Sequence, residues 1–234
     1  MPYGYYYGFD IYYLALILPA FLLSLFAQFK VKSTFSKYSD MLSSTRLTGA
    51  EAAKRVLSSH GVYDVSVERV SGELTDHFDP RTKVIRLSDS VYDATSVAAV
   101  GVAAHEAGHA VQYNENYAPI KFRNLLVPVV NFGSRFSWIA LMLGLVMSFQ
   151  PLVFIGIGLF SFAALFQLVT LPVELNASKR AMETIKGDYL LREDEEVRGA
   201  RKVLTAAAMT YLAAVVMSIA QLIRLLAIFG RRRR

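Results

Sequence analysis

The 234-residue sequence contains no cysteine, which excludes both a disulfide framework and a thiolate metal site. Any metal ion must therefore be held by nitrogen and oxygen ligands. Charged residues are also scarce, at 19% of the chain, whereas hydrophobic residues make up 54%. That hydrophobic fraction exceeds the ~45–50% of an average soluble domain. Despite a net charge of +6, the composition predicts a membrane protein with a modest water-exposed part and excludes a nucleic-acid-binding protein.

Long apolar runs predict helices that cross a lipid bilayer. The first lies within residues 1–29, where Ile11 to Phe29 carries no charge and Pro19 is expected to kink the helix. A transmembrane hairpin is expected over residues 124–173. A last hydrophobic helix is expected within residues 203–234, which end in four arginines suited to anionic lipid headgroups. Whether it crosses completely is left open, because a full crossing would put these arginines outside, against the positive-inside rule. The tyrosine-rich start of the chain is typical of an interfacial aromatic belt.

Two charged blocks, residues 30–123 and 174–202, separate the apolar runs. The first block opens with Lys30, Lys32 and Lys37 directly after the first predicted span. Lysine and arginine accumulate on the cytoplasmic side of membrane proteins, so both blocks are assigned to the cytoplasm. The predicted fold is therefore mainly α, with multi-pass transmembrane helices and a small cytoplasmic α+β domain.

The first charged block carries the signals of that α+β domain. Thr48 and Glu51 form a capping-box pattern at the start of a helix. Residues 65–67 and 83–87 are typical of short strands, and a turn-rich loop joins them. Residues 97–111 are helical in character and apolar on nearly every side, which indicates a buried helix.

The predicted buried helix contains an H-E-x-x-H motif formed by His105, Glu106 and His109. Histidines four residues apart share one face of a helix, so both imidazoles can reach one Zn²⁺ ion. Glu106 then lies beside the metal, where it can act as a general base. Three polar residues on an Ala- and Val-rich helix need such a reason, because buried charge without a partner is costly.

A catalytic zinc ion needs a third protein ligand, and Glu174 is the best candidate. It is a lone carboxylate among apolar residues at the end of the predicted hairpin. The alternative is an ordinary juxtamembrane charge paired with Lys179 or Arg180. Glu183 is a weaker competitor for the same role.

The motif, the hairpin-length spacer and Glu174 with Ala177 resemble membrane gluzincins of the HtpX and CaaX-prenyl-protease kind. The sequence resembles bacterial YugP-like membrane zinc metallopeptidases more closely, over nearly the whole chain. This resemblance implies a zincin-like domain, a multi-pass protein of the bacterial plasma membrane, a cytoplasmic zinc site and endopeptidase activity. HtpX-like enzymes place an aspartate four residues after the glutamate ligand, where this sequence has Ser178.

The loop before residues 83–87 supplies a further candidate, His77. Gluzincins bind the substrate backbone along an edge strand, and Lys83 to Leu87 could be that edge. His77 would then donate a hydrogen bond to the developing oxyanion. The alternative is that Asp76, His77 and Asp79 only form a capped turn.

The leading interpretation is an integral-membrane zinc endopeptidase that cleaves peptides or membrane proteins at the cytoplasmic face. One alternative is a zinc hydrolase of non-peptide amides or esters, because the motif specifies the metal and the base but not the bond cleaved. Another is a catalytically silent adaptor in which zinc only staples helices together. Closed structural sites favour four ligands, often cysteine, so the absence of cysteine argues against the adaptor.

Overall fold

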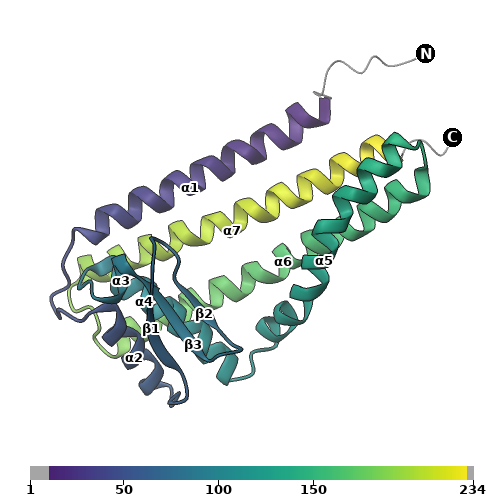
Figure 1. The fold of residues 1–234 in the computed structure, drawn as a ribbon. Coiled ribbons are helices and arrows are strands. Elements are labelled where there is room, and N and C mark those ends of the chain that lie inside the picture. The colour runs from purple at the N-terminus through teal and green to yellow at the C-terminus, as the bar shows by residue number, and fades with distance from the viewer. Residues whose placement is uncertain (1–10, 231–234) are drawn as a thin grey trace. The chain divides into compact units, whose positions relative to one another are not determined.

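A computed structural model describes residues 11–230 and shows a mainly helical chain with one small mixed sheet (Figure 1). In chain order the elements are the π-helix η1 (Tyr13–Ile17), α1 (Leu18–Ser39), α2 (Gly49–Ser59), β1 (Ser66–Val70), β2 (His77–Asp79), β3 (Val84–Ser88), α3 (Asp89–Tyr92), α4 (Val97–Asn114), α5 (Ala118–Val146), α6 (Gln150–Gly187) and α7 (Asp194–Phe229). The predictions for the tyrosine-rich start and for the Arg231–Arg234 tail concern residues 1–10 and 231–234, which lie outside the described residues.

Four helices are long and apolar enough to cross a membrane: three correspond to the predicted spans and the fourth to the last hydrophobic helix, whose crossing the sequence left open. These helices cover Tyr13–Ser39, Ala118–Val146, Gln150–Gly187 and Asp194–Phe229. All four extend further into charged sequence than predicted: the first passes Phe29, the second begins at Ala118, the third passes residue 173 and the last begins before residue 203. The charged stretch after Phe29 contains neither proline nor glycine, so nothing ends the helix at the edge of the apolar run.

Pro19 changes the winding of the first helix. A proline has no N–H group and cannot close the α-helical hydrogen bond to Ala15 four residues earlier. The helix relaxes into the π-form over Tyr13–Ile17, immediately before the proline, and α1 continues from Leu18. The winding of the helix changes next to Pro19, and the predicted kink stays a prediction.

The internal contacts divide the chain into two compact units. The first, called the apolar unit, comprises the residues up to Ala27, Phe122–Leu171 and the residues from Thr210; the second, called the motif unit, comprises Gln28–Lys121 and Pro172–Met209. Large apolar side chains of the apolar unit are exposed, for example Phe132 at 60% and Val146 at 83%. Such exposure suits contact with lipid rather than with water.

Helix α4 forms the centre of the motif unit. Apart from the partly buried Val102, its alanines and valines from Val97 to Val111 are almost completely buried, as the sequence predicts for a helix that is apolar all round. They belong to one core cluster with α2, the sheet, and the parts of α6 and α7 in this unit. The predicted capping box is confirmed, because Thr48 and Glu51 exchange hydrogen bonds at the start of α2.

The sheet has the strand order β1-β3-β2, with β1 parallel and β2 antiparallel to β3. The expectation that Lys83 to Leu87 forms an edge is therefore wrong, since β3 is the central strand and is buried on both faces. The edge beside α4 is β2, whose Phe78 ring lies 6.0 Å from that of Tyr113. Residues 77–79, predicted to belong to a loop, form this strand; three residues are too few to show an alternating pattern in the sequence.

A close approach of two backbones sets the distance between α4 and α6 in the motif unit. Gly108 lies between the two motif histidines, and a Cβ atom there would lie 2.8 Å from the backbone oxygen of Ala177. A backbone atom cannot rotate away as a flexible side chain could. Only glycine therefore allows the two helices to come this close.

We expect Gly108→Ala to lower both the thermal stability and the zinc content of the detergent-purified protein. Alanine ordinarily stabilises a helix interior by about 0.5–1 kcal/mol relative to glycine, so a loss of stability would report the steric clash with Ala177. The control is Gly158→Ala on α6, where an added Cβ atom meets nothing within 4 Å. Equal melting temperatures and equal zinc contents for the two variants would contradict the close-approach explanation.

Candidate metal centre

The structure brings together the three predicted ligands from two helices of the motif unit. Nε2 of His105 and Nε2 of His109, both on α4, each lie 3.3 Å from Oε2 of Glu174 on α6. The two imidazole rings are 4.7 Å apart and nearly perpendicular, at 81°. The Glu174 residue is 2% exposed, so a carboxylate is buried against two imidazoles.

The surroundings of His109 determine which of its ring nitrogens carries the proton. Nε2 of Gln112 lies 2.9 Å from the carbonyl oxygen of Val173, and because a carbonyl can only accept, the Gln112 amide must donate there. Oε1 of Gln112 therefore faces His109 Nδ1 at 3.0 Å and can only accept. Nδ1 of His109 must carry the hydrogen, so in the neutral ring Nε2 presents a lone pair to Glu174.

Ser178 supports His105 in a similar way. Its hydroxyl oxygen lies 3.1 Å from His105 Nδ1, on the side of the ring away from Glu174. When that hydroxyl accepts the Nδ1–H, His105 also presents an Nε2 lone pair to the carboxylate. A serine thus contacts the histidine from the position where HtpX-like enzymes have an aspartate.

The donor set fits a zinc ion. Three atoms that accept hydrogen bonds converge within 4.8 Å of one another, and they repel unless a cation or a proton lies between them. A tetrahedral ion with bonds of about 2.0–2.1 Å requires ligand atoms about 3.3–3.4 Å apart, and the two histidine–glutamate separations are 3.3 Å. Two imidazoles and one carboxylate are also the ligand set of catalytic zinc sites in peptidases.

The hydrogen bonds continue from Gln112 to the surface. Oδ1 of Asn176 accepts from Gln112 Nε2 at 2.8 Å and from Arg180 Nε at 2.9 Å. Nη1 of Arg180 lies 2.6 Å from Oε2 of Glu115 at the end of α4. Gln112 and Asn176 are not among the predicted site residues, although a glutamine one turn after His109 on an apolar helix is a usable signal.

The residues that the sequence offered as a replacement or as an ion-pair partner for Glu174 contact other side chains. Glu183 is largely exposed and pairs with Lys179 at 3.7 Å. Arg180 pairs with Glu115. The alternative in which Glu174 is an ordinary charge paired with Lys179 or Arg180 therefore does not describe this structure.

Glu106 lies on α4 beside the three converging residues and is 9% exposed. Burial raises the pKa of its carboxyl to about 7, and the negative charge of Glu174 adds to this effect, while His105 opposes it. No hydrogen bond to the carboxylate is found among the described residues. A carboxyl group with a pKa near neutrality is suited to exchanging a proton during a reaction.

His77 begins the edge strand β2, and its side chain is exposed. Its Nδ1 lies 2.8 Å from the carbonyl oxygen of Thr75, so Nδ1 must donate. Donation by Nε2 to an oxyanion would therefore require the doubly protonated ring. The predicted role of His77 stays a prediction.

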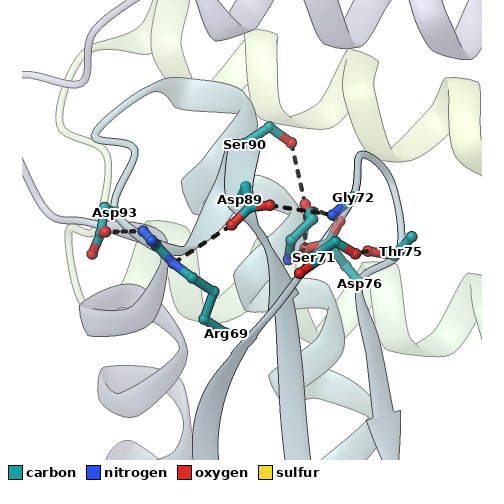
Figure 2. Close-up of polar contacts among 9 residues, drawn as sticks. Arg69, Ser71, Gly72, Thr75, Asp76, Asp89, Ser90 and Asp93 are labelled. Carbon is teal, nitrogen blue, oxygen red and sulfur yellow. Dashed lines mark hydrogen bonds and ion pairs between the residues drawn. The ribbon is translucent and has the colours of Figure 1, made fainter.

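A polar network holds the loop that leads into β2. Figure 2 shows Arg69 bound to Asp89 and Asp93, and the backbone N–H of Gly72 directed at Asp89. Asp76, the residue before His77, accepts hydrogen bonds from the backbone N–H and the hydroxyl of Ser88 at the end of β3. Asp79 caps the following turn by accepting from the Arg81 N–H and the Thr82 hydroxyl.

Comparison with known proteins identifies relatives over almost the whole chain. Residues 13–230 match the model of a family described as "Putative neutral zinc metallopeptidase". A relative from Bacillus subtilis (strain 168), "Putative membrane protease YugP", is 48% identical over 217 residues, which are 93% of this chain and 96% of the relative. No solved structure matches the chain.

We expect Gln112→Met to weaken zinc binding by about 10–100-fold, as is typical when a residue that orients a metal-bound histidine is lost. Methionine has a similar volume but cannot hold the Nδ1–H of His109. Chelator competition on the purified protein measures the affinity. Asn114→Met, an exposed amide on the same helix, is the control and should bind zinc as the wild type does. Wild-type affinity in Gln112→Met would show that the amide does not orient His109.

Proposed function

Since the chain belongs to the family of neutral zinc metallopeptidases, we propose that it is an integral-membrane zinc endopeptidase of the gluzincin type. The observation that carries this proposal is the convergence of His105, His109 and Glu174 beside the buried Glu106. In this proposal the motif unit is a zincin-like domain. The three converging residues hold the metal, and Glu106 remains free for catalysis.

Zinc bound by these residues would supply a Lewis acid that makes a water molecule more acidic and polarises the substrate carbonyl. Glu106 accepts a proton from the attacking water as the new carbon–oxygen bond forms. It then donates that proton to the departing amine as the carbon–nitrogen bond breaks. Gln112 and Ser178 keep the Nε2 atoms of the two histidines directed at the metal.

The free edge of β2 is the proposed site for the substrate backbone. This strand pairs with β3 on one side only and lies beside α4, so an extended peptide can add to the sheet there. His77 begins this strand and would be next to the bound peptide. In its doubly protonated form it would donate a hydrogen bond to the oxyanion.

We place residues 30–123 and 174–202 on the cytoplasmic side of a bacterial plasma membrane. Lys30, Lys32 and Lys37 follow the first apolar run, whereas the turn between α5 and α6 has no lysine or arginine. Four crossings by the candidate helices are consistent with both blocks on one side. The substrates would then be peptides or membrane-protein segments close to the cytoplasmic face.

We expect Glu106→Gln to retain zinc and fold while peptide hydrolysis falls by about 10²–10⁴-fold, because the proton acceptor is lost. The measurement is cleavage of a peptide or membrane-protein substrate by the detergent-purified protein, with the zinc content determined on the same sample. Glu183→Gln, which removes an exposed carboxylate of α6, is the control and should cleave normally.

Each outcome for Glu106→Gln separates two functions. Full zinc with no cleavage supports the endopeptidase. Wild-type cleavage would show that Glu106 is not the base. If the wild type also fails to cleave although it holds zinc, the protein is the zinc-stapled adaptor or acts on non-peptide bonds.

Glu174→Ala should lose zinc, because one of the three proposed ligands is removed. Full zinc occupancy in that variant, measured by metal analysis, would remove Glu174 from the site.

The proposed topology predicts that single cysteines at Ser58 and Lys186 are labelled from the cytoplasmic side. Both residues are exposed, and the chain has no native cysteine to interfere. Met147→Cys, in the turn between α5 and α6, is the control and should be labelled from the opposite side. Labelling of Ser58→Cys and Lys186→Cys from different sides would contradict a zinc site built from both blocks.

A further inference from the structure

Within the motif unit, α1 and α7 line a cavity of about 510 Å³ that is strongly basic. Lys30 and Lys37 come from α1, and Arg201 and Lys202 come from α7. The other lining residues are hydroxyl-bearing or apolar, and the cavity has no aspartate or glutamate in its wall. A concave surface with four cations and no anion has the composition of an anion-binding site.

The four cations lack an acidic partner in the part of the chain that the structure describes. Among the described residues none of them forms an ion pair, whereas the Arg86 and Arg180 side chains of the same unit each contact carboxylates. The hydroxyl of Thr34, a residue that is only 8% exposed, also lines the cavity and has no hydrogen-bond partner among the described residues. Mutual repulsion of the cations and the free hydroxyl would both be relieved by a bound phosphate group.

The position of these cations along both helices indicates the depth of the cavity in a membrane. Lys30 directly follows Phe29, which ends an apolar run and is 71% exposed. On α7, Lys202 directly precedes the apolar run that begins at Val203. Lys30 and Lys202 therefore occur where charged sequence changes to lipid-compatible sequence, which is the level of phospholipid headgroups.

We propose that this cavity binds the phosphate headgroup of an anionic membrane phospholipid. Lys30, Lys37, Arg201 and Lys202 neutralise the headgroup, and Thr34 donates a hydrogen bond to it. The acyl chains extend along the apolar surface that includes Phe29. The site is separate from the zinc ligands, and its occupancy does not depend on whether the chain cleaves peptides.

The test measures lipid binding to the detergent-purified full chain by native mass spectrometry. Phosphatidylglycerol should bind to the wild type at a defined stoichiometry and phosphatidylcholine should not. Lys37→Gln/Arg201→Gln should weaken phosphatidylglycerol binding by about 25-fold, from about fivefold per cation. The control Lys32→Gln/Arg198→Gln removes the same charge from the same two helices but outside the cavity wall, and it should change binding by no more than about twofold.

The competing explanations give different results. An equal loss in the two double variants would show diffuse surface charge rather than a site, and equal binding of phosphatidylcholine would show no selectivity for anions. Competition by millimolar glycerol phosphate would assign the cavity to a soluble phosphate compound and overturn the lipid proposal. If circular dichroism shows that Lys37→Gln/Arg201→Gln has lost helix, Lys30→Gln/Lys202→Gln takes its place, and wild-type binding by that pair overturns the proposal.

Discussion

The contact between α4 and α6 at Gly108 and Ala177 is the constraint on which the site depends. Two histidines on one helix can direct their Nε2 atoms to a common point, but a third ligand must come from another chain segment at backbone-contact distance. The small residues of α4 allow that distance, and their burial on all sides keeps it constant. The composition of α4, rich in alanine, glycine and valine, is therefore part of the metal site as much as of the core.

Within this packed region a single backbone carbonyl determines the direction of a chain of hydrogen bonds. Because the Val173 oxygen can only accept, the amide of Gln112 has one allowed orientation, and His109 has one allowed neutral tautomer. Asn176 and Arg180 extend the chain of hydrogen bonds to Glu115. The backbone carbonyl of Val173 thus orients one end of the network, and the ion pair between Arg180 and Glu115 orients the other. The orientation of the imidazole is thus established by the folded protein before any ion arrives.

The sequence predicts those features that depend on local pattern. The number of apolar helices, the capping box at Thr48 and the buried character of α4 follow from periodicity and composition, and the motif histidines follow from their spacing. Strand β2 and the central position of β3 depend on pairing between residues that are distant in the chain. Such pairing leaves no local pattern in a single sequence. The role of Gln112 depends in part on Val173 and Asn176, which lie on another helix, whereas its contact with His109 on α4 agrees with their spacing along the chain.

The burial of the centre has a consequence for the valence of the ion. With neutral imidazoles, the ionised carboxylate of Glu174 brings one negative charge into the centre, and Glu106, whose pKa lies near 7, brings a second when it is deprotonated; both carboxylates are less than 10% exposed. An uncompensated charge there is costly, so a divalent cation balances the centre when both carboxylates are ionised. A monovalent ion would leave the centre negative and a trivalent ion would leave it positive. The charge of the centre therefore adds to the preferences of the ligand atoms in favouring a divalent ion such as Zn²⁺.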